Sequence, residues 1–167
     1  MANATMTSVA EYLATSYRPD REYVDGLILE RNVGEWDHSR LQMRIAAFLY
    51  GHEAEWGITV VPEQRVQVSQ ERFRVPDVTV LAGSHTGEQI LTRAPFVCIE
   101  ILSKDDRMSE MQERISDYLA FGVAHVWVID PRTRRCFEYT SGGMRTITEG
   151  ALTTSSPAIT LPLSECF

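Results

Sequence analysis

The sequence predicts an α/β fold in which a mixed β-sheet is flanked by helices and preceded by an N-terminal β-hairpin. Three observations lead to this prediction. An Asp-Gly pair separates two short apolar pieces within residues 21–31, which is the strongest short-range signal for a hairpin. Two later segments have apolar residues at helical spacing. Finally, a strand, a helix and a second strand follow one another over residues 96–129, an order that indicates a parallel crossover.

The N-terminal third is predicted to form a short helix, the hairpin and a longer helix. Ser8 and Glu11 fit a capping box for a helix that ends near Thr15, although Thr7 is an alternative cap. The longer helix is expected from Asp37 to about Glu53, with Asp37 as its cap. Its core-facing residues are Leu41, Ile45, Phe48 and Leu49.

The middle of the chain is predicted to form strands. Residues 58–61 and 64–68 are rich in β-branched residues, and the second piece alternates with period two. A third strand is expected over residues 75–81, with Pro76 at its start because proline cannot donate to a sheet ladder. A loop over residues 82–94 follows.

The second half carries the strand-helix-strand unit. A strand over residues 96–102 precedes a helix over about residues 106–121, which Gly122 ends. A dense apolar strand over residues 123–129 stops at Asp-Pro, and residues 136–139 are expected to pair back on it. The helix is predicted to bury Met108, Met111, Ile115 and Leu119.

Length and composition favour one domain spanning residues 1–167, since 44% hydrophobic residues suffice for one core and hardly for two. No apolar run approaches the roughly 20 residues that cross a bilayer, and the N-terminus lacks the order of a signal peptide. A cytoplasmic protein without a membrane partner is therefore expected. Cys98, Cys136 and Cys166 are far apart, so free thiols are expected rather than a disulfide framework or a zinc site.

The net charge of -7 is unusual for a protein that binds nucleic acid, because phosphate binding usually accompanies an excess of Lys and Arg. Charge alone favours a small molecule or a protein as partner, unless a bound cation neutralises some of the acidic groups.

Two carboxylates are predicted to face each other across neighbouring strands. If Leu81 lies opposite Phe96 in an antiparallel pair, then Asp77 lies opposite Glu100, with Cβ atoms about 4.5 to 5.5 Å apart. Like charges at this distance repel. The fold tolerates them if one carboxyl stays protonated, if a basic group intervenes, or if a hard cation lies between them.

With these residues in place, the chain resembles the PD-(D/E)XK nuclease superfamily and, more narrowly, its Uma-two family of restriction-endonuclease-like proteins. Any single motif is weak, but their order and spacing together are specific. The matching pieces are Glu22 to Gly26, the helix with His38, Val75 to Val78, Ile99 to Ser103, Tyr118 to Val123, Val126 to Pro131 and Leu161 to Phe167.

The resemblance implies a restriction-endonuclease-like core in which Asp77, Glu100 and the carbonyl of Ile101 hold Mg²⁺, with Mn²⁺ as a substitute. The implied activity is a Mg²⁺-dependent DNA endonuclease that hydrolyses phosphodiesters by attack of metal-bound water. DNA binding is expected to be weak and to depend on the metal because of the net charge. A homodimer is expected by analogy only, since cutting both strands often requires a symmetric pair.

The chain departs from the superfamily at the lysine of the motif, where it has Leu102. In the Uma-two family this lysine often comes from the next helix, four residues before the tyrosine, and here that position is Arg114. A guanidinium supplies charge and hydrogen bonds but stays protonated and cannot act as a general base. If an amine is required, only Lys104 remains, because it is the single lysine of the chain.

Other polar residues have structural alternatives. His38 shares a helix face with Leu41, so a hydrogen-bonded histidine at the core edge competes with a catalytic role that the resemblance suggests. Glu22 is either a surface acid or an outer ligand to metal-bound water, and the same two readings apply to Glu63. Asp105 and Asp106 are expected to cap the following helix.

Three functions therefore remain from the sequence. The first is the metal-dependent endonuclease, with Asp77 and Glu100 as metal ligands and with Lys104 or Arg114 orienting water and offsetting charge. The second is a catalytically degraded module that binds metal or nucleic acid without cutting, because the motif lysine is missing. The third is a protein-interaction domain in which the acids line a groove.

Overall fold

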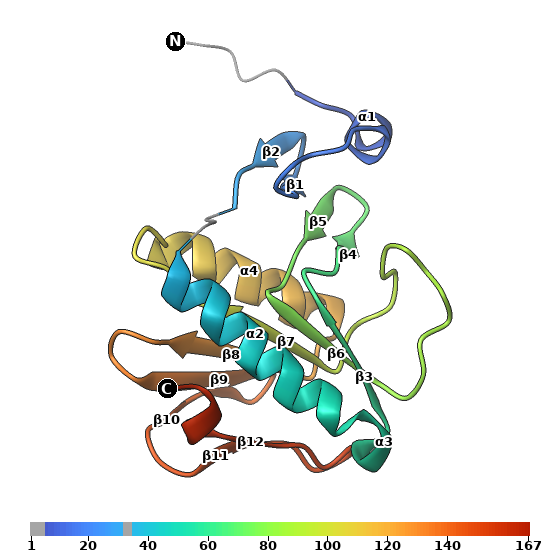
Figure 1. Cartoon of the computed structure of the whole chain (residues 1–167). Coiled ribbons are helices and arrows are strands. Elements are labelled where there is room, and N and C mark those ends of the chain that lie inside the picture. The colour runs from blue at the N-terminus through green and yellow to red at the C-terminus, as the bar shows by residue number, and fades with distance from the viewer. Residues whose placement is uncertain (1–5, 32–34) are drawn as a thin grey trace.

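The computed structural model describes residues 6–31 and 35–167, and its centre is a six-stranded mixed sheet (Figure 1). The strands lie in the order β10-β9-β8-β7-β6-β3. Strands β7 and β8 are parallel, whereas the other neighbours are antiparallel. The six strands are β3 (Ile58–Pro62), β6 (Val78–Ala82), β7 (Val97–Ile101), β8 (His125–Asp130), β9 (Arg135–Thr140) and β10 (Gly143–Ile147). The predicted mixed α/β fold is thus confirmed.

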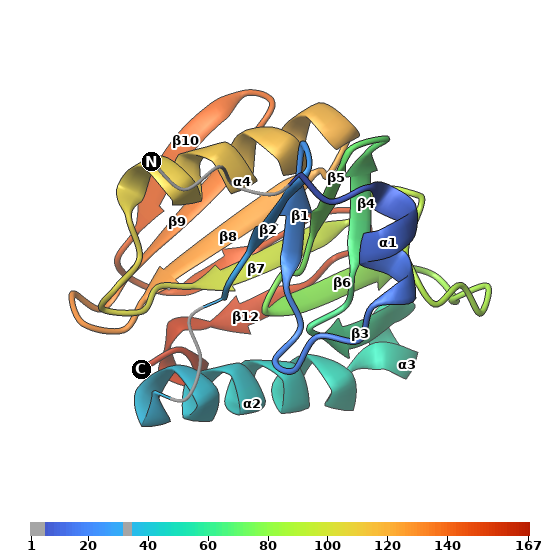
Figure 2. The ribbon, with the colours of Figure 1, turned by 90° about the horizontal axis from the view of Figure 1, so that it is seen from above.

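Two helices, α2 (Trp36–Gly51) and α4 (Met108–Phe121), cover opposite faces of this sheet, as Figure 2 shows. Alternation along a strand explains the two layers, because successive side chains point to opposite faces. Trp127 and Ile129 of β8 share a core cluster with the α2 side chains Leu41, Ile45 and Leu49. The intervening residues Val126 and Val128 pack with Met111, Ile115 and Tyr118 of α4.

A second sheet of four strands holds the N-terminal segment, in the order β2-β1-β5-β4. The predicted hairpin is present: Glu22 pairs with Leu29, and Asp25 and Gly26 turn the chain with positive φ angles of 49° and 91°. Gly26 suits this turn because it has no Cβ to oppose a positive φ. The four strands are β1 (Glu22–Val24), β2 (Leu27–Leu29), β4 (Val66–Ser69) and β5 (Arg72–Arg74).

Short elements complete the fold at both ends. Helix α1 (Val9–Ala14) begins at Ser8, whose Oγ accepts from the backbone N–H of Glu11 at 3.2 Å, as predicted. Near the C-terminus, β11 (Ala151–Thr153) and β12 (Thr160–Pro162) form a two-stranded sheet followed by the 3-10 helix η1 (Leu163–Glu165). These three elements were not predicted, although Leu152 and Leu161 are buried in the core on the α2 side of the sheet.

Several predicted boundaries and caps are wrong. Asp37 lies in the first turn of α2, and the helix begins after Glu35 without a side-chain cap. The helix ends at Gly51, and a separate one-turn helix α3 (Glu53–Trp56) follows, after which Gly57 adopts a left-handed conformation. Residues 75–77 precede β6 instead of opening it, because the ladder with β3 and β7 begins at Val78.

The strand-helix-strand unit of β7, α4 and β8 forms the predicted parallel crossover, with Val97 beside His125 and Ile101 beside Ile129. Gly122 ends α4 in a left-handed conformation, as expected. Within the described residues, no helix is long and apolar enough to cross a membrane.

Candidate metal and catalytic site

Asp77 and Glu100 come together at the edge where β6 begins and β7 ends. The antiparallel register pairs Val78 with Ile99 and Val80 with Val97, so its continuation places Asp77 opposite Glu100. Both carboxylates are buried, with 4% and 3% of their surfaces exposed. The predicted arrangement is therefore present, and two carboxyl groups meet inside the fold.

The Asp77 carboxylate is held by donors from three directions. Its Oδ1 contacts Arg31 Nη2 at 3.0 Å, and its Oδ2 lies 3.2 Å from His38 Nε2. The backbone N–H of Ile101 also donates to Oδ2 at 2.8 Å. Burial would lower the pKa of His38, but the hydrogen bond and charge of Asp77 outweigh burial and raise it. His38 is thus an orienting partner of Asp77.

Glu100 has a different environment, because it makes fewer favourable contacts. Within the described part of the chain its carboxylate accepts one hydrogen bond, from Tyr118 Oη to Oε1 at 2.6 Å. Burial and the nearby charge of Asp77 raise the pKa of Glu100 to about 8, and Arg114 and Tyr118 only partly oppose this shift. A carboxyl that is destabilised as an anion in this way gains from a nearby cation.

Glu22 and Arg114 form a buried ion cluster behind Glu100. Glu22 Oε2 lies 2.8 Å from Arg74 Nη1 and 3.2 Å from Arg114 Nε, and Oε1 accepts from the backbone N–H of Val75 at 3.1 Å. Burial alone would raise the pKa of Glu22, but the two guanidinium groups outweigh it and hold the pKa below its usual value. Glu22 is therefore not a surface acid, and its carboxylate holds Arg114 in place.

A cavity of about 20 Å³ lies between these groups. Its lining includes both carboxylates and the two guanidinium groups, and the complete set is Arg31, His38, Asp77, Glu100, Ile101, Asp106 and Arg114. A water molecule needs roughly 10–15 Å³ by this measure, so the space suits one water or one small ion.

These residues fit Mg²⁺ in charge and in donor type. Mg²⁺ prefers oxygen ligands, retains several waters and is commonly bound through one or two carboxylates. Among the described residues no group of three or more His, Cys, Asp or Glu side chains is arranged to hold a metal. The protein would therefore supply Asp77, Glu100 and the backbone at Ile101, and the ion would compete with Arg31 for Asp77.

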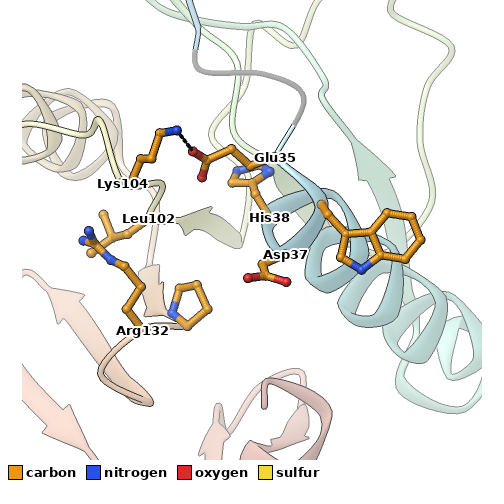
Figure 3. Close-up of a pocket in the computed structure, with 8 residues that line it drawn as sticks. Glu35, Asp37, His38, Leu102, Lys104 and Arg132 are labelled. Carbon is orange, nitrogen blue, oxygen red and sulfur yellow. Dashed lines mark ion pairs between the residues drawn. The ribbon is translucent and has the colours of Figure 1, made fainter.

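Lys104 does not join this cluster. Its side chain is 67% exposed, and Nζ lies 3.3 Å from Glu35 Oε1 at the N-terminal end of α2 (Figure 3). Asp106, by contrast, lines the small cavity, accepts from the N–H of Ser103 at 2.6 Å and lies 4.0 Å from Arg114. Arg107 occupies the N-cap position of α4, so the predicted capping role of Asp105 and Asp106 is wrong.

Three buried partners were missed in the sequence. Arg31 has no periodic or motif signal, because it follows the hairpin in an irregular segment. Arg74 lies in β5, a strand that was not predicted. Tyr118 could have been found, because it lies four residues after Arg114 in α4 and residues at this spacing share a helix face. Glu63, which had two readings, is an exposed acid 3.4 Å from Arg31 Nη1.

Comparisons with known proteins identify the family and the fold of the chain. A solved structure described as a "putative nuclease belonging to DUF820" from Anabaena variabilis ATCC 29413 superposes with a TM-score of 0.84 at 23% identity, covering 95% of this chain and 96% of that one. At this identity the likeness shows the fold. No curated protein matches the sequence. The Uma2 family model, described as "Putative restriction endonuclease", matches residues 9–164. The chain therefore belongs to the Uma2 family and has the fold of a structure described as a nuclease.

Proposed function

We propose that the protein is a Mg²⁺-dependent endonuclease that hydrolyses phosphodiester bonds of DNA. The observation that carries the proposal is the pair of buried carboxylates, Asp77 and Glu100, facing a cavity the size of one ion. Membership of the Uma2 family and the nuclease-like fold support the same reaction class. When bound, Mg²⁺ would lower the pKa of water and stabilise charge on the phosphoryl oxygens.

The chain's own residues have separate tasks in this proposal. Asp77, Glu100 and the backbone at Ile101 hold the cation. His38 and the N–H of Ile101 fix the orientation of the Asp77 carboxylate. Tyr118 does the same for Glu100. Because all these contacts come from strands or packed helices, the ligands are held before the substrate arrives.

Arg114 takes the position of the missing motif lysine. It reaches the cavity from α4 and is itself held by Glu22, so its charge is fixed beside Glu100. Burial would lower the pKa of Arg114, but the charges of Glu22 and Glu100 outweigh burial and raise the pKa. It therefore stays protonated, offsets negative charge on the phosphate and orients water by hydrogen bonds, without accepting a proton. The proton leaves through solvent or the substrate phosphate.

Cleavage of supercoiled plasmid tests the proposal. The purified protein should nick the plasmid with Mg²⁺ or Mn²⁺ and not with EDTA, and Asp77→Ala should abolish nicking. Glu30→Ala is the matched control, because Glu30 is an acid whose side chain is 77% exposed. If the parent binds metal and DNA but does not cut, the protein is the degraded module that the absence of a motif lysine would produce. Equal nicking by Asp77→Ala and the parent would contradict the assigned site.

A symmetric pair of chains would allow both DNA strands to be cut. Sedimentation of the protein with and without a DNA duplex distinguishes a dimer from a monomer that only nicks.

A further inference from the structure

Two larger cavities lie beside the Asp77–Glu100 site. The first, of about 420 Å³, lies between the N-terminal end of α2 and the segments that follow β7 and β8 (Figure 3). His38 lines both this cavity and the small one at the carboxylates, so the two adjoin. The second, of about 230 Å³, adjoins the first because Asp37 and Pro131 line both. A continuous surface thus leads away from the site.

Basic side chains gather along this surface. Lys104 and Arg132 line the first cavity, and three arginines line the second. Two acidic residues, Glu35 and Asp37, line the first cavity, and Asp37 also lines the second. This local excess of positive charge is opposite in sign to the net charge of -7 of the whole chain. We call the five basic residues the basic track: Arg40, Arg44, Lys104, Arg132 and Arg134.

Most of the charge on the basic track is not neutralised by the protein. Within the described residues, Arg40, Arg44 and Arg134 form no ion pair, and Arg44 donates to the uncharged carbonyl of Ser164 at 2.8 Å. Arg134 lies over the ring of Phe167, 5.4 Å from its centroid. By contrast, the buried arginines around the catalytic site are each paired with one or more carboxylates. The other two basic residues are paired, Lys104 with Glu35 at 3.3 Å and Arg132 with Asp130 at 3.7 Å. Arg40, Arg44 and Arg134 are therefore the cations of the track that are available to an external anion.

The placement of these side chains suits an extended anion better than a single small one. Arg40 and Arg44 are four residues apart in α2, so their side chains are neighbours on one helix face. Arg132 and Arg134 come from the connection between β8 and β9, which packs near the C-terminal residues that contact α2. Like charges held close together in this way repel, and a row of phosphates would relieve the repulsion. Guanidinium groups also match phosphate geometry with paired hydrogen bonds.

We propose that the basic track binds the phosphodiester backbone of the nucleic-acid strand that enters the Asp77–Glu100 site. This inference rests on the proposed function and deepens it, because it assigns the surface that holds the substrate. It also explains how a chain with net negative charge approaches a polyanion: on this side of the site, five basic residues outnumber the two acidic residues that line the cavities. Affinity then depends on salt through the phosphates that the track contacts.

Binding, rather than cleavage, tests the track. A short fluorescein-labelled DNA duplex is titrated in Mg²⁺ with protein that carries Glu100→Gln, so that cutting does not enter the comparison. In that background, the pair Arg40→Ala and Arg134→Ala should raise Kd at least about tenfold at low salt. It should also reduce the slope of log K against log salt by about 1.8, at about 0.9 for each lost phosphate contact. Arg40→Lys with Arg134→Lys should restore most of the lost affinity and most of the lost salt slope.

The matched control removes the same charge from another surface. Arg18 and Arg93 are exposed and lie outside both cavities, so Arg18→Ala with Arg93→Ala should leave the slope unchanged. Equal losses of DNA affinity in the two alanine pairs, or no loss in either pair, would contradict the proposed role of the basic track. A second titration with a labelled single strand shows whether one phosphodiester backbone is sufficient for binding to the track. Because the titration needs no cleavage, it can fail while plasmid nicking succeeds, or succeed while nicking fails.

Discussion

Two buried glutamates on the central sheet, Glu138 and Glu100, show how differently the fold treats the same group. Glu138 in β9 is 3% exposed and accepts from His125 Nδ1 at 2.9 Å, from Trp127 Nε1 at 3.2 Å and from Arg145. Burial would raise the pKa of Glu138, but these donors outweigh it and lower the pKa. Glu100 in β7 is equally buried, yet among residues 6–31 and 35–167 it has one donor and a carboxylate neighbour, and its pKa rises to about 8.

Under the proposed function, this difference separates a carboxylate that stabilises the protein, Glu138, from one that binds a metal ion, Glu100. The contacts of Glu138 are complete without any external group. The environment of Glu100 instead disfavours its anion until a cation arrives, which is typical of functional sites, where burial and like charges shift pKa values. The following experiments test this contrast and the basic residues near Glu100, in order from the largest expected effect to the smallest.

The largest effect is expected on cleavage. Glu100→Gln should reduce plasmid nicking at least about a thousandfold, because a metal ligand contributes several kcal/mol to transition-state stabilisation. Glu138→Gln, measured well below its melting temperature, should stay within about threefold of the parent. Similar losses in both variants would show that Glu100 acts only through the fold.

For stability, the larger effect is expected from substituting Glu138 rather than Glu100. Glu138→Ala should lower the free energy of unfolding by about 2–4 kcal/mol, because it leaves the buried donors of Trp127 and His125 without a partner. This expected loss of unfolding free energy lies at the low end of the range for a buried ion pair. The reason is that the Arg145 side chain is 63% exposed and returns to water. Urea denaturation in EDTA measures the change, with Glu30→Ala as the exposed control. A change smaller than that of Glu100→Gln would contradict the contrast.

The pH dependence of stability should carry the signature of Glu100. Its folded pKa of about 8 lies above its ordinary value of 4.5, so between these values the folded state keeps a proton that the unfolded state loses. In metal-free buffer the parent should therefore lose stability as pH rises from 4.5 to 8. Glu100→Gln should lack this loss and be the more stable protein at pH 8. Parallel pH profiles for the two proteins would rule out the raised pKa.

The smallest effects are expected at Lys104, and Arg114 provides the comparison. At saturating DNA, Lys104→Ala and Lys104→Arg should change kcat by less than about threefold, because this exposed side chain lies outside the small cavity. Arg114→Ala should lower kcat by roughly a hundredfold, while Arg114→Lys retains much of the activity. If Lys104→Arg were inactive while Arg114→Ala still cleaved DNA, the amine role would belong to Lys104.

Much of the site could be predicted because it lies on regular strands. The alternation of β6 and β7 and the predicted pairing of Leu81 with Phe96 at the ends of their connecting loop specify the register that brings Asp77 opposite Glu100. Arg31 could not be found in this way, since it reaches Asp77 from an irregular segment 46 residues earlier. The predicted capping role of Asp37 is wrong because α2 begins two residues earlier, with Glu35 at the N-cap position and Asp37 in the first turn.

The edge of the sheet was also difficult to predict. Strand β10 is exposed along almost its whole length, so it lacks the alternation that marks a half-buried strand. The short strands β11 and β12 each bury a single leucine, which is too weak a periodic signal. None of these three strands contributes a residue to the lining of the small cavity, so the prediction of Asp77 and Glu100 did not depend on them.

Calorimetric titration with Mn²⁺ tests the central claim most directly, because it asks whether Asp77 and Glu100 hold a cation, with Glu138 as a buried carboxylate that does not. The parent and Glu138→Gln should each show one binding site. Asp77→Ala and Glu100→Gln should bind at least about tenfold more weakly, since each loses one of the two anionic ligands. Equal binding by all four proteins would contradict the assignment of the site.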